Sequence, residues 1–446
     1  MSKIKKYLSL FVFLSILGCG FLYFYYFPSL NQDAVKYLFH DANKVKNENN
    51  FVFHLAGMHA PMNAKDIHGY GYKRYQNGLE KYTNLRSIEE DSDLPVIKNR
   101  LELEVDGLAL KCWLFEVEYD DVECYRDDEV KNIIYKNQIL LSRYKQSFKY
   151  SEIDSHTVLN PKITEFMGLQ ILFLSEKKQE LRNGFDKELV KEVIEEFKLY
   201  QNILSSETTL VEKAIFMVMH GISREFIHDI LSKYPNEVRQ IHNEIEPLLS
   251  NFNEDNFNIP GMYRKEFALL NSGLCVTRYL KIESDLLCHP ASRGIEYASA
   301  YAINDFYQYY FNNKDIILNN MNDITKICNE KETEQEIKNK DFDFLIHYPL
   351  YPYYPIYSVL KDGMLKGCRV IENMKSSIAR SRALKLIIDI NFNKISKDNI
   401  SYYLKNVADK EYLSGKSYQY DSVKKVIKFP EGLPEFVYNR EFKIFN

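Results

Sequence analysis

The sequence predicts a mainly α-helical protein with an N-terminal transmembrane helix, an antiparallel helical array and a small C-terminal β-hairpin. Three patterns support this prediction. An unbroken apolar run covers residues 7–27, and apolar residues recur at spacings of three and four through the middle of the chain, which is the helical period. Near the C-terminus, residues 418–429 place apolar positions on both sides of a polar turn, which is typical of a hairpin.

The apolar run at the N-terminus follows Lys3, Lys5 and Lys6 and ends at Pro28. It is long enough to cross a hydrocarbon core as a helix, which takes about 20 residues. Lysines before such a helix favour a cytoplasmic N-terminus. We therefore expect residues 1–28 to form a cytoplasmic tip and a single-pass anchor in the bacterial inner membrane, with the body of the chain in the periplasm.

Two other fates of this segment stay open. Residues 16–19 resemble a lipobox, which would make Cys19 the lipid-carrying residue of a bacterial lipoprotein. A cleaved signal peptide would need a small-x-small site, which only residues 18–20 approach. The aromatic run at residues 21–27 is typical of an interfacial belt and favours the uncleaved anchor. A eukaryotic type II membrane protein would have the same topology.

Composition sets the scale of the exported part. The 446 residues, 45% of them hydrophobic, suffice for one to three domains. The net charge of −4 comes from 58 basic and 62 acidic residues without a basic stripe, so we expect no nucleic-acid partner. Residues 29–50 read as a polar tether. Residues 51–446 read as the exported, mainly helical domain, with candidate internal boundaries near residue 150 and at residues 329–341.

Six cysteines lie beyond the anchor, and an even number in an oxidising compartment predicts disulfides. Cys112 and Cys124 flank an acidic turn between two short hydrophobic runs, so we expect this pair first. Cys275–Cys288 is a second expectation, and Cys328–Cys368 follows by elimination, although six cysteines allow 15 pairings. The chain contains no C-x-x-C pair, which argues against a zinc knuckle or a thioredoxin-like site.

Several segments have a predicted conformation. Residues 51–66 read as a looped or extended segment because Pro61 bars a simple helix, and residues 95–118 carry the best strand-like alternation. The three prolines in residues 347–355 predict an extended run. Helical spacing predicts helices over residues 66–82, 187–204, 206–221, 223–234, 292–313 and 374–391.

Two sets of residues are candidates for binding. His54, His59 and His68 lie close together in sequence, and three imidazoles suit zinc or copper. No closely spaced carboxylate or thiolate completes that set, so we predict no metal and no cofactor. The second set lies in the Tyr/Pro run, where tyrosines on a stiff backbone can stack on sugars or line a peptide groove, or can instead pack across helices as a linker. Its members are Tyr348, Tyr351, Tyr353 and Tyr354.

Other motifs are better explained by structure than by chemistry. Glu225 and His228 form an E-x-x-H pair, but a di-iron bundle needs a second such pair, which the chain lacks. His220 falls in the last turn of a predicted helix, where the helix dipole favours it. Residues 69–71 form a lone G-x-G without the rest of a nucleotide-binding fingerprint. We therefore assign no catalytic residue.

The order of segments along the chain resembles a known group of proteins. The anchor is followed by FHLAGMHAPMNAKDIHGYGY at residues 53–72, a helical middle and SGKSYQYDSVKKVIKF at residues 414–429. Together they resemble a group of uncharacterised, single-pass, membrane-anchored proteobacterial proteins with a helical exported domain. The resemblance implies architecture and carries no activity.

These observations favour a non-catalytic envelope role, in which the helical body binds a protein partner at the periplasmic face of the inner membrane. An anchored inhibitor or immunity protein is one version of that role. The alternative is an envelope hydrolase acting on peptidoglycan, lipid or glycan, with a site at the histidines or the Tyr/Pro run. An exposed apolar patch would favour the first, and a concave pocket with convergent polar groups would favour the second.

Overall fold

The computed structural model describes residues 50–83, 97, 99–117, 122–153, 163–259, 261–262, 265, 354–412, 414–430 and 442–443. The predicted anchor, most of the tether and the predicted helix at residues 292–313 lie outside these ranges. The chain divides into two compact units, and nearly all of the described residues belong to the unit formed by residues 44–82, 92–266 and 367–446. Within the described ranges, no helix combines the length and the apolarity that a membrane span needs.

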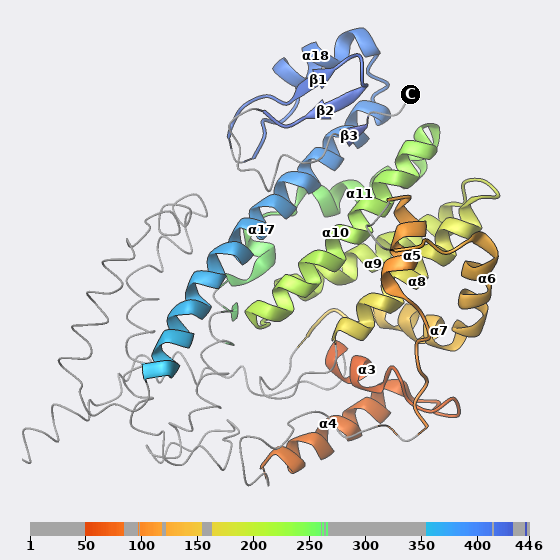
Figure 1. Ribbon diagram of the computed structural model, residues 1–446. Coiled ribbons are helices and arrows are strands. Elements are labelled where there is room, and N and C mark those ends of the chain that lie inside the picture. The colour runs from red at the N-terminus through yellow and green to blue at the C-terminus, as the bar shows by residue number, and fades with distance from the viewer. Residues whose placement is uncertain are drawn as a thin grey trace, which may run out of the picture. The chain divides into compact units, whose positions relative to one another are not determined.

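The predicted helical fold class is confirmed, and a small antiparallel sheet lies near the C-terminus (Figure 1). The first described helices are α3 (Phe51–Gly57) and α4 (Ile67–Thr83). The looped conformation expected for residues 51–66 is therefore wrong in its first half. Pro61 lies beyond the end of α3, and Asn50 begins that helix by accepting a hydrogen bond from the Val52 amide at 3.0 Å.

Helices α3 and α4 cross with their backbones in contact at two glycines. A β-carbon on Gly71 would overlap the carbonyl oxygen of Phe53, and one on Gly57 would overlap the carbonyl oxygen of Ile67. Only glycine allows such a close approach of two backbones. The second glycine of the G-x-G, Gly71, therefore has a packing role in this helix crossing.

Helix α5 (Gly107–Phe115) replaces the strand expected within residues 95–118. The side chain of Asp106 caps it by accepting hydrogen bonds from the amides of Leu108 and Ala109 at 2.9 and 3.2 Å. Alternation holds before Asp106, where residues 101–106 are irregular, and a nearly continuous apolar stretch follows the cap. A short apolar run of this kind fits a buried helix as well as a strand.

Further helices continue from the Cys124 region to residue 250. They are α6 (Asp127–Lys136), α7 (Gln138–Gln146), α8 (Ile163–Leu181), α9 (Lys187–Ser205), α10 (Leu210–Lys233) and α11 (Val238–Ser250), with 3-10 turns η1 (Ser147–Lys149), η2 (Pro235–Glu237) and η3 (Glu254–Phe257). The predicted helix at residues 187–204 is confirmed by α9. Its start follows the prediction, because Asp186 caps it through the Glu188 amide at 2.9 Å.

One continuous helix, α10, stands where the sequence predicts two separated near Gly221. A glycine inside a helix costs about 1 kcal/mol relative to alanine, which is too little to break a helix that tertiary packing supports. Met219, His220, Ile222 and Ser223 around it are all buried. Burial on both sides of the glycine therefore keeps the helix intact.

Helices α8, α9 and α10 pack side by side and alternate in direction (Figure 1). Between α8 and α9, Lys177 pairs with Glu192 at 2.9 Å. Between α9 and α10, Ser223 donates to Glu196 at 2.8 Å, while Lys213, ten residues earlier, donates to the carbonyl oxygen of Leu204. Their inward faces form the centre of the core, in which Phe166, Phe173, Phe197 and Phe216 are fully buried.

The C-terminal part begins with the long helix α17 (Tyr354–Phe392), followed by α18 (Lys397–Asn406). The helix predicted at residues 374–391 is confirmed but starts earlier, so the extended run expected at residues 347–355 is wrong for its last two residues. Pro355 is the second residue of α17, in the first turn, where its missing amide hydrogen costs nothing. Residues 347–353 lie outside the described part.

The predicted hairpin is confirmed by strands β1 (Gln419–Asp421) and β2 (Val426–Lys428), which pair antiparallel with Tyr420 opposite Ile427. A third short strand, β3 (Phe442–Lys443), pairs with the other edge of β2. Asp421 closes the turn by accepting hydrogen bonds from the amides of Val423 and Lys424 at 3.1 and 3.0 Å. Such a turn is the standard local role of an aspartate.

Candidate functional site

The three histidines that the sequence offers as binding residues have structural roles. His54 is 1% exposed, and its Nε2 donates to the carbonyl oxygen of Arg143 at 2.7 Å. Burial lowers the pKa of His54 to about 4, against the opposing effect of that carbonyl. Its ring packs against the ring of Tyr150, with 5.0 Å between the two ring centroids. His54 is therefore neutral near pH 7 and joins α3 to the end of α7.

His59 is held between two oxygen acceptors. Its Nδ1 donates to the carbonyl oxygen of Leu101 at 2.7 Å, and its Nε2 faces the Glu165 carboxylate at 3.2 Å. Burial lowers the pKa of His59, while the carbonyl and Glu165 act in the opposite direction. Arg100 contacts the same carboxylate at 3.2 Å. The contacts among His59, Arg100 and Glu165 connect the chain after α3 to the first turn of α8.

His68 stacks on Tyr150, with 5.1 Å between ring centroids, and its Nε2 donates to the carbonyl oxygen of Asn50 at 3.2 Å. Burial lowers its pKa as well. The structure thus brings His54 and His68 to the same tyrosine ring, and places His59 in a different contact. Over the described ranges, no three His, Cys, Asp or Glu side chains form a group that could hold a metal ion.

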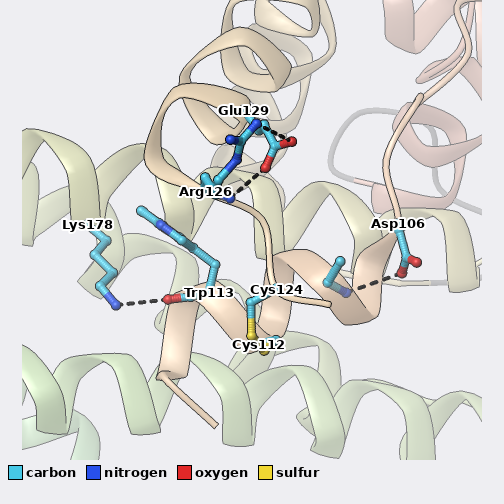
Figure 2. Close-up of a disulfide and its surroundings, with 8 residues drawn as sticks. Asp106, Cys112, Trp113, Cys124, Arg126, Glu129 and Lys178 are labelled. Atoms are coloured by element: carbon cyan, nitrogen blue, oxygen red, sulfur yellow. Dashed lines mark hydrogen bonds and ion pairs between the residues drawn. A yellow bond between two sulfur atoms is a disulfide. The ribbon is translucent and has the colours of Figure 1, made fainter. Parts of the chain in front are cut away.

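The structure describes only some of the other predicted site residues. Tyr348, Tyr351 and Tyr353 lie outside the described residues, and Tyr354 is the first residue of α17. Cys112 and Cys124 form a disulfide with 5.3 Å between their Cα atoms, which is the pairing that the sequence predicts (Figure 2). Cys275, Cys288 and Cys328 lie outside the described residues, as does the side chain of Cys368, so the two other pairings stay predictions.

The residues around the disulfide make contacts that stabilise the fold. Trp113 donates from its indole nitrogen to Asp127 at 2.8 Å, and Arg182 also binds that carboxylate. The ammonium of Lys178 donates to the carbonyl oxygens of Trp113 and Leu114 at 3.0 and 2.8 Å, so it caps the C-terminal end of α5 (Figure 2). Lys178 and Arg182 also lie over the indole ring. These contacts fasten α5 and the disulfide to α8.

A buried polar cluster, the Glu196 network, joins four helices. The Glu196 carboxyl accepts hydrogen bonds from Tyr144 and from Ser223, the latter at 2.8 Å. Tyr200 bonds to Tyr144, and Gln170 donates to Ser223 at 2.9 Å. Burial raises the pKa of Glu196 to about 8, so the carboxyl is mostly protonated at pH 7. Sequence reasoning missed it, although Glu196 stands inside the apolar stripe of α9 beside Val193 and Tyr200.

Two further buried side chains lie at the interface of α9 and α10. Lys213 is fully buried and donates to the carbonyl oxygen of Ser206 at 2.7 Å, and burial lowers its pKa to about 7. His220 is stacked between Phe197 and Phe252, at 4.3 and 4.7 Å between centroids. The expected helix-dipole role of His220 is wrong, because α10 continues past it. Aromatic packing explains the residue instead.

The outer face of α10 carries apolar residues that remain accessible to solvent, and we call this surface the α10 stripe. Val211 is 59% exposed and Val218 is 51% exposed. They lie seven residues, or about two helical turns, apart on the same face. The residues of the α10 stripe are Val211, Ala214, Ile215, Val218 and Gly221, none of which is buried.

The same face of α10 becomes charged toward the C-terminal end of the helix. Asp229 is exposed, Glu225 is partly exposed, and His228 lies 3.8 Å from Asp229. The E-x-x-H pair of Glu225 and His228, for which the sequence favours a structural explanation, is part of the polar end of this face. The arrangement is an apolar surface about three turns long with acidic residues at one end.

No family model, no curated protein and no solved structure matches this chain.

Proposed function

We propose that the chain is a membrane-anchored envelope protein whose helical domain binds a protein partner at the periplasmic face of the inner membrane. The observation that carries this proposal is the α10 stripe. Two large aliphatic side chains, Val211 and Val218, are more than half exposed on one helix face, with Ala214 and Ile215 between them and Gly221 beyond Val218. Contiguous exposed apolar surface is typical of interaction sites.

The chemistry of the face defines the partner as an amphipathic helix. The small residues Ala214 and Gly221 let a second helix approach closely, and a β-carbon at Gly221 would meet only the tip of Arg224, at 3.7 Å. An amphipathic helix fits such a surface by placing its own apolar ridge along it. Since Glu225 and Asp229 lie at one end, the partner helix carries lysine or arginine at the matching end.

A second copy of this chain fits the α10 stripe less well. Two copies of α10 packed antiparallel would set Glu225 and Asp229 of each against the apolar end of the other. Packed parallel, they would set the acidic residues against one another. Both arrangements are unfavourable, because juxtaposed like charges and charges desolvated against apolar surface cost free energy.

The proposed location depends on the apolar run at residues 7–27 and the lysines before it. The Cys112–Cys124 disulfide supports an oxidising compartment such as the periplasm. One version of this role is an inhibitor or immunity protein, which acts by binding its protein partner and needs no catalytic residue. The hydrolase alternative stays a prediction. The histidines offered for it are engaged with backbone carbonyls, and the Tyr/Pro run lies almost entirely outside the described residues.

Site-specific photo-crosslinking in cells tests the proposal. A photoreactive residue replaces Val218 in the full-length protein, and a matched control replaces Val423, which is 90% exposed in the turn between β1 and β2. We expect a partner adduct at position 218 alone, mapped by mass spectrometry to an amphipathic helix with a basic end. Adducts at both positions, an adduct with a second copy of this chain, or none at position 218 would contradict the proposal.

A second variant checks that the surface and not the fold is responsible. Val211→Asp combined with Val218→Asp introduces charge into the α10 stripe without touching the core. We expect loss of a crosslink formed from Ala214, with an unchanged far-ultraviolet circular dichroism spectrum. Val423→Asp should keep that crosslink. Retention of the adduct in the double variant would show that the α10 stripe is not the docking surface.

A further inference from the structure

A hollow of about 530 Å³ lies on a different surface, between α7 and α8, and we call it the α7–α8 hollow. Its volume falls in the range of small-ligand sites, roughly 300–1,000 Å³. One wall is a face of α7, and the opposite side is contributed by Glu176 of α8. The lining residues are Gln138, Leu141, Ser142, Lys145, Gln146 and Glu176.

The α7 wall offers three neutral polar side chains in a row. Gln138, Ser142 and Gln146 are spaced by four residues, so they lie above one another on one helix face. All three are exposed, and none of their side chains forms a hydrogen bond with another described residue. The row is about 12 Å long at 1.5 Å per residue. Each amide both donates and accepts hydrogen bonds, and the hydroxyl does the same.

The charged lining residues neutralise each other. The ammonium of Lys145 lies 2.7 Å from the Glu176 carboxylate and 3.8 Å from that of Glu192. Lys177, which is 1% exposed, lies 3.7 Å from Glu176 and 2.9 Å from Glu192. An anion would compete with these carboxylates for the lysines, and a cation would compete with the lysines for the carboxylates. The hollow therefore suits neither a phosphate nor a metal ion.

An apolar ligand is also a poor match, because Leu141 is the single aliphatic residue of the lining and it is buried. An uncharged ligand rich in hydroxyl groups matches best, since each of its hydroxyls can pair with a group that donates and accepts.

We propose that the α7–α8 hollow binds a linear, uncharged oligosaccharide, with Gln138, Ser142 and Gln146 as the hydrogen-bonding residues. The length of the row gives room for more than one sugar ring. This site uses no residue of the α10 stripe. A protein that docks a partner on α10 would hold a glycan chain of the envelope on α7.

Titration of the full-length protein with two soluble oligosaccharides, chitotetraose and maltohexaose, tests this proposal by saturation-transfer NMR and calorimetry. We expect saturable binding of at least one of them. The double variant Gln138→Ala, Gln146→Ala should bind the sugar about tenfold more weakly or worse. This is the effect expected when one or two hydrogen bonds to an uncharged ligand are lost. Gln76→Ala, an exposed glutamine on α4, is the matched control and should leave the binding unchanged.

Each result decides the proposal. Failure of both sugars to bind at millimolar concentration would overturn it, as would equal binding by the double variant and the wild type. A protein adduct from a photoreactive residue at Ser142, without any sugar binding, would also overturn it and would assign the α7–α8 hollow to a protein partner. These outcomes are independent of the crosslinking result on α10.

Discussion

The substitution Glu196→Gln should stabilise the protein at neutral pH. Glu196 is fully buried, and burial raises the pKa of its carboxyl from 4.5 to about 8 in the folded state. In the unfolded chain the same carboxyl regains its ordinary pKa and is ionised at pH 7. Folding therefore requires the uptake of a proton at this site, which destabilises the folded state at pH 7. Glutamine has nearly the same shape and needs no proton.

The magnitude follows from the pKa values. One unit of pKa corresponds to about 1.36 kcal/mol, and pH 7 lies about 2.5 units above the unfolded value. The penalty at pH 7 is therefore about 3 kcal/mol, which is the upper limit of the stabilisation by glutamine. The sign is fixed by proton counts, because the folded state binds more protons than the unfolded state between pH 4.5 and about 8. The contribution of Glu196 to stability is complete below pH 4.5 and is lost as the pH rises to about 8.

Urea unfolding of the full-length protein between pH 5 and pH 8 measures this effect. The fluorescence of Trp113, the single tryptophan, and far-ultraviolet circular dichroism are suitable probes. We expect the difference in unfolding free energy between Glu196→Gln and wild type to grow with pH by up to about 1.4 kcal/mol per unit. Glu195→Gln, at a neighbouring side chain that is 54% exposed, should stay within about 0.5 kcal/mol of wild type.

Two results would refute this reasoning. A difference between Glu196→Gln and wild type that does not change with pH would show that Glu196 keeps its ordinary pKa in the folded state. A destabilised variant at pH 8 would show that the hydrogen bonds from Tyr144 and Ser223 depend on a carboxylate and cannot be kept by an amide.

Three further predictions concern stability. Gly71→Ala should destabilise the protein by about 3 kcal/mol or more in urea unfolding, because the new methyl overlaps the backbone of α3. At Gly221 the new methyl makes only an ordinary contact with Arg224 at 3.7 Å, so Gly221→Ala should be neutral or stabilising by up to about 1 kcal/mol. Lys213→Met should abolish the rise in stability with pH that we expect for wild type between about pH 8 and 10.5, since burial lowers the pKa of this lysine and the opposite effect of Glu196 ends near pH 8; an unchanged pH profile would contradict this role. Replacing Cys112 and Cys124 by alanine should lower the unfolding free energy by about 3 kcal/mol, as expected for a loop of this length, and equal urea midpoints would argue against the disulfide.

Part of the candidate site could be predicted from the sequence, and part could not. The apolar residues of the α10 stripe, such as Ala214 and Val218, are visible in the sequence as members of a helical pattern. The pattern does not say which of them face solvent, because α10 has apolar residues on most of its circumference. Packing against α8, α9 and α17 leaves this one face accessible. Similarly, the row formed by Gln138, Ser142 and Gln146 becomes part of a hollow only because Glu176 of α8 lies opposite.

Elements with local signals can be predicted from the amino-acid order alone. Helix α9 follows from its amphipathic period and the Asp186 cap, the hairpin from the polar turn at residues 421–425, and the Cys112–Cys124 pair from two cysteines close together in the chain. Tertiary structure decided the continuity of α10 through Gly221 and the engagement of His54 and His59. Helices α3 and α5 have local caps at Asn50 and Asp106, and burial of their apolar residues then favours helix over loop or strand. Each of these outcomes depends on packing against residues distant in sequence, because packing outweighs the cost of a glycine and burial keeps an imidazole neutral.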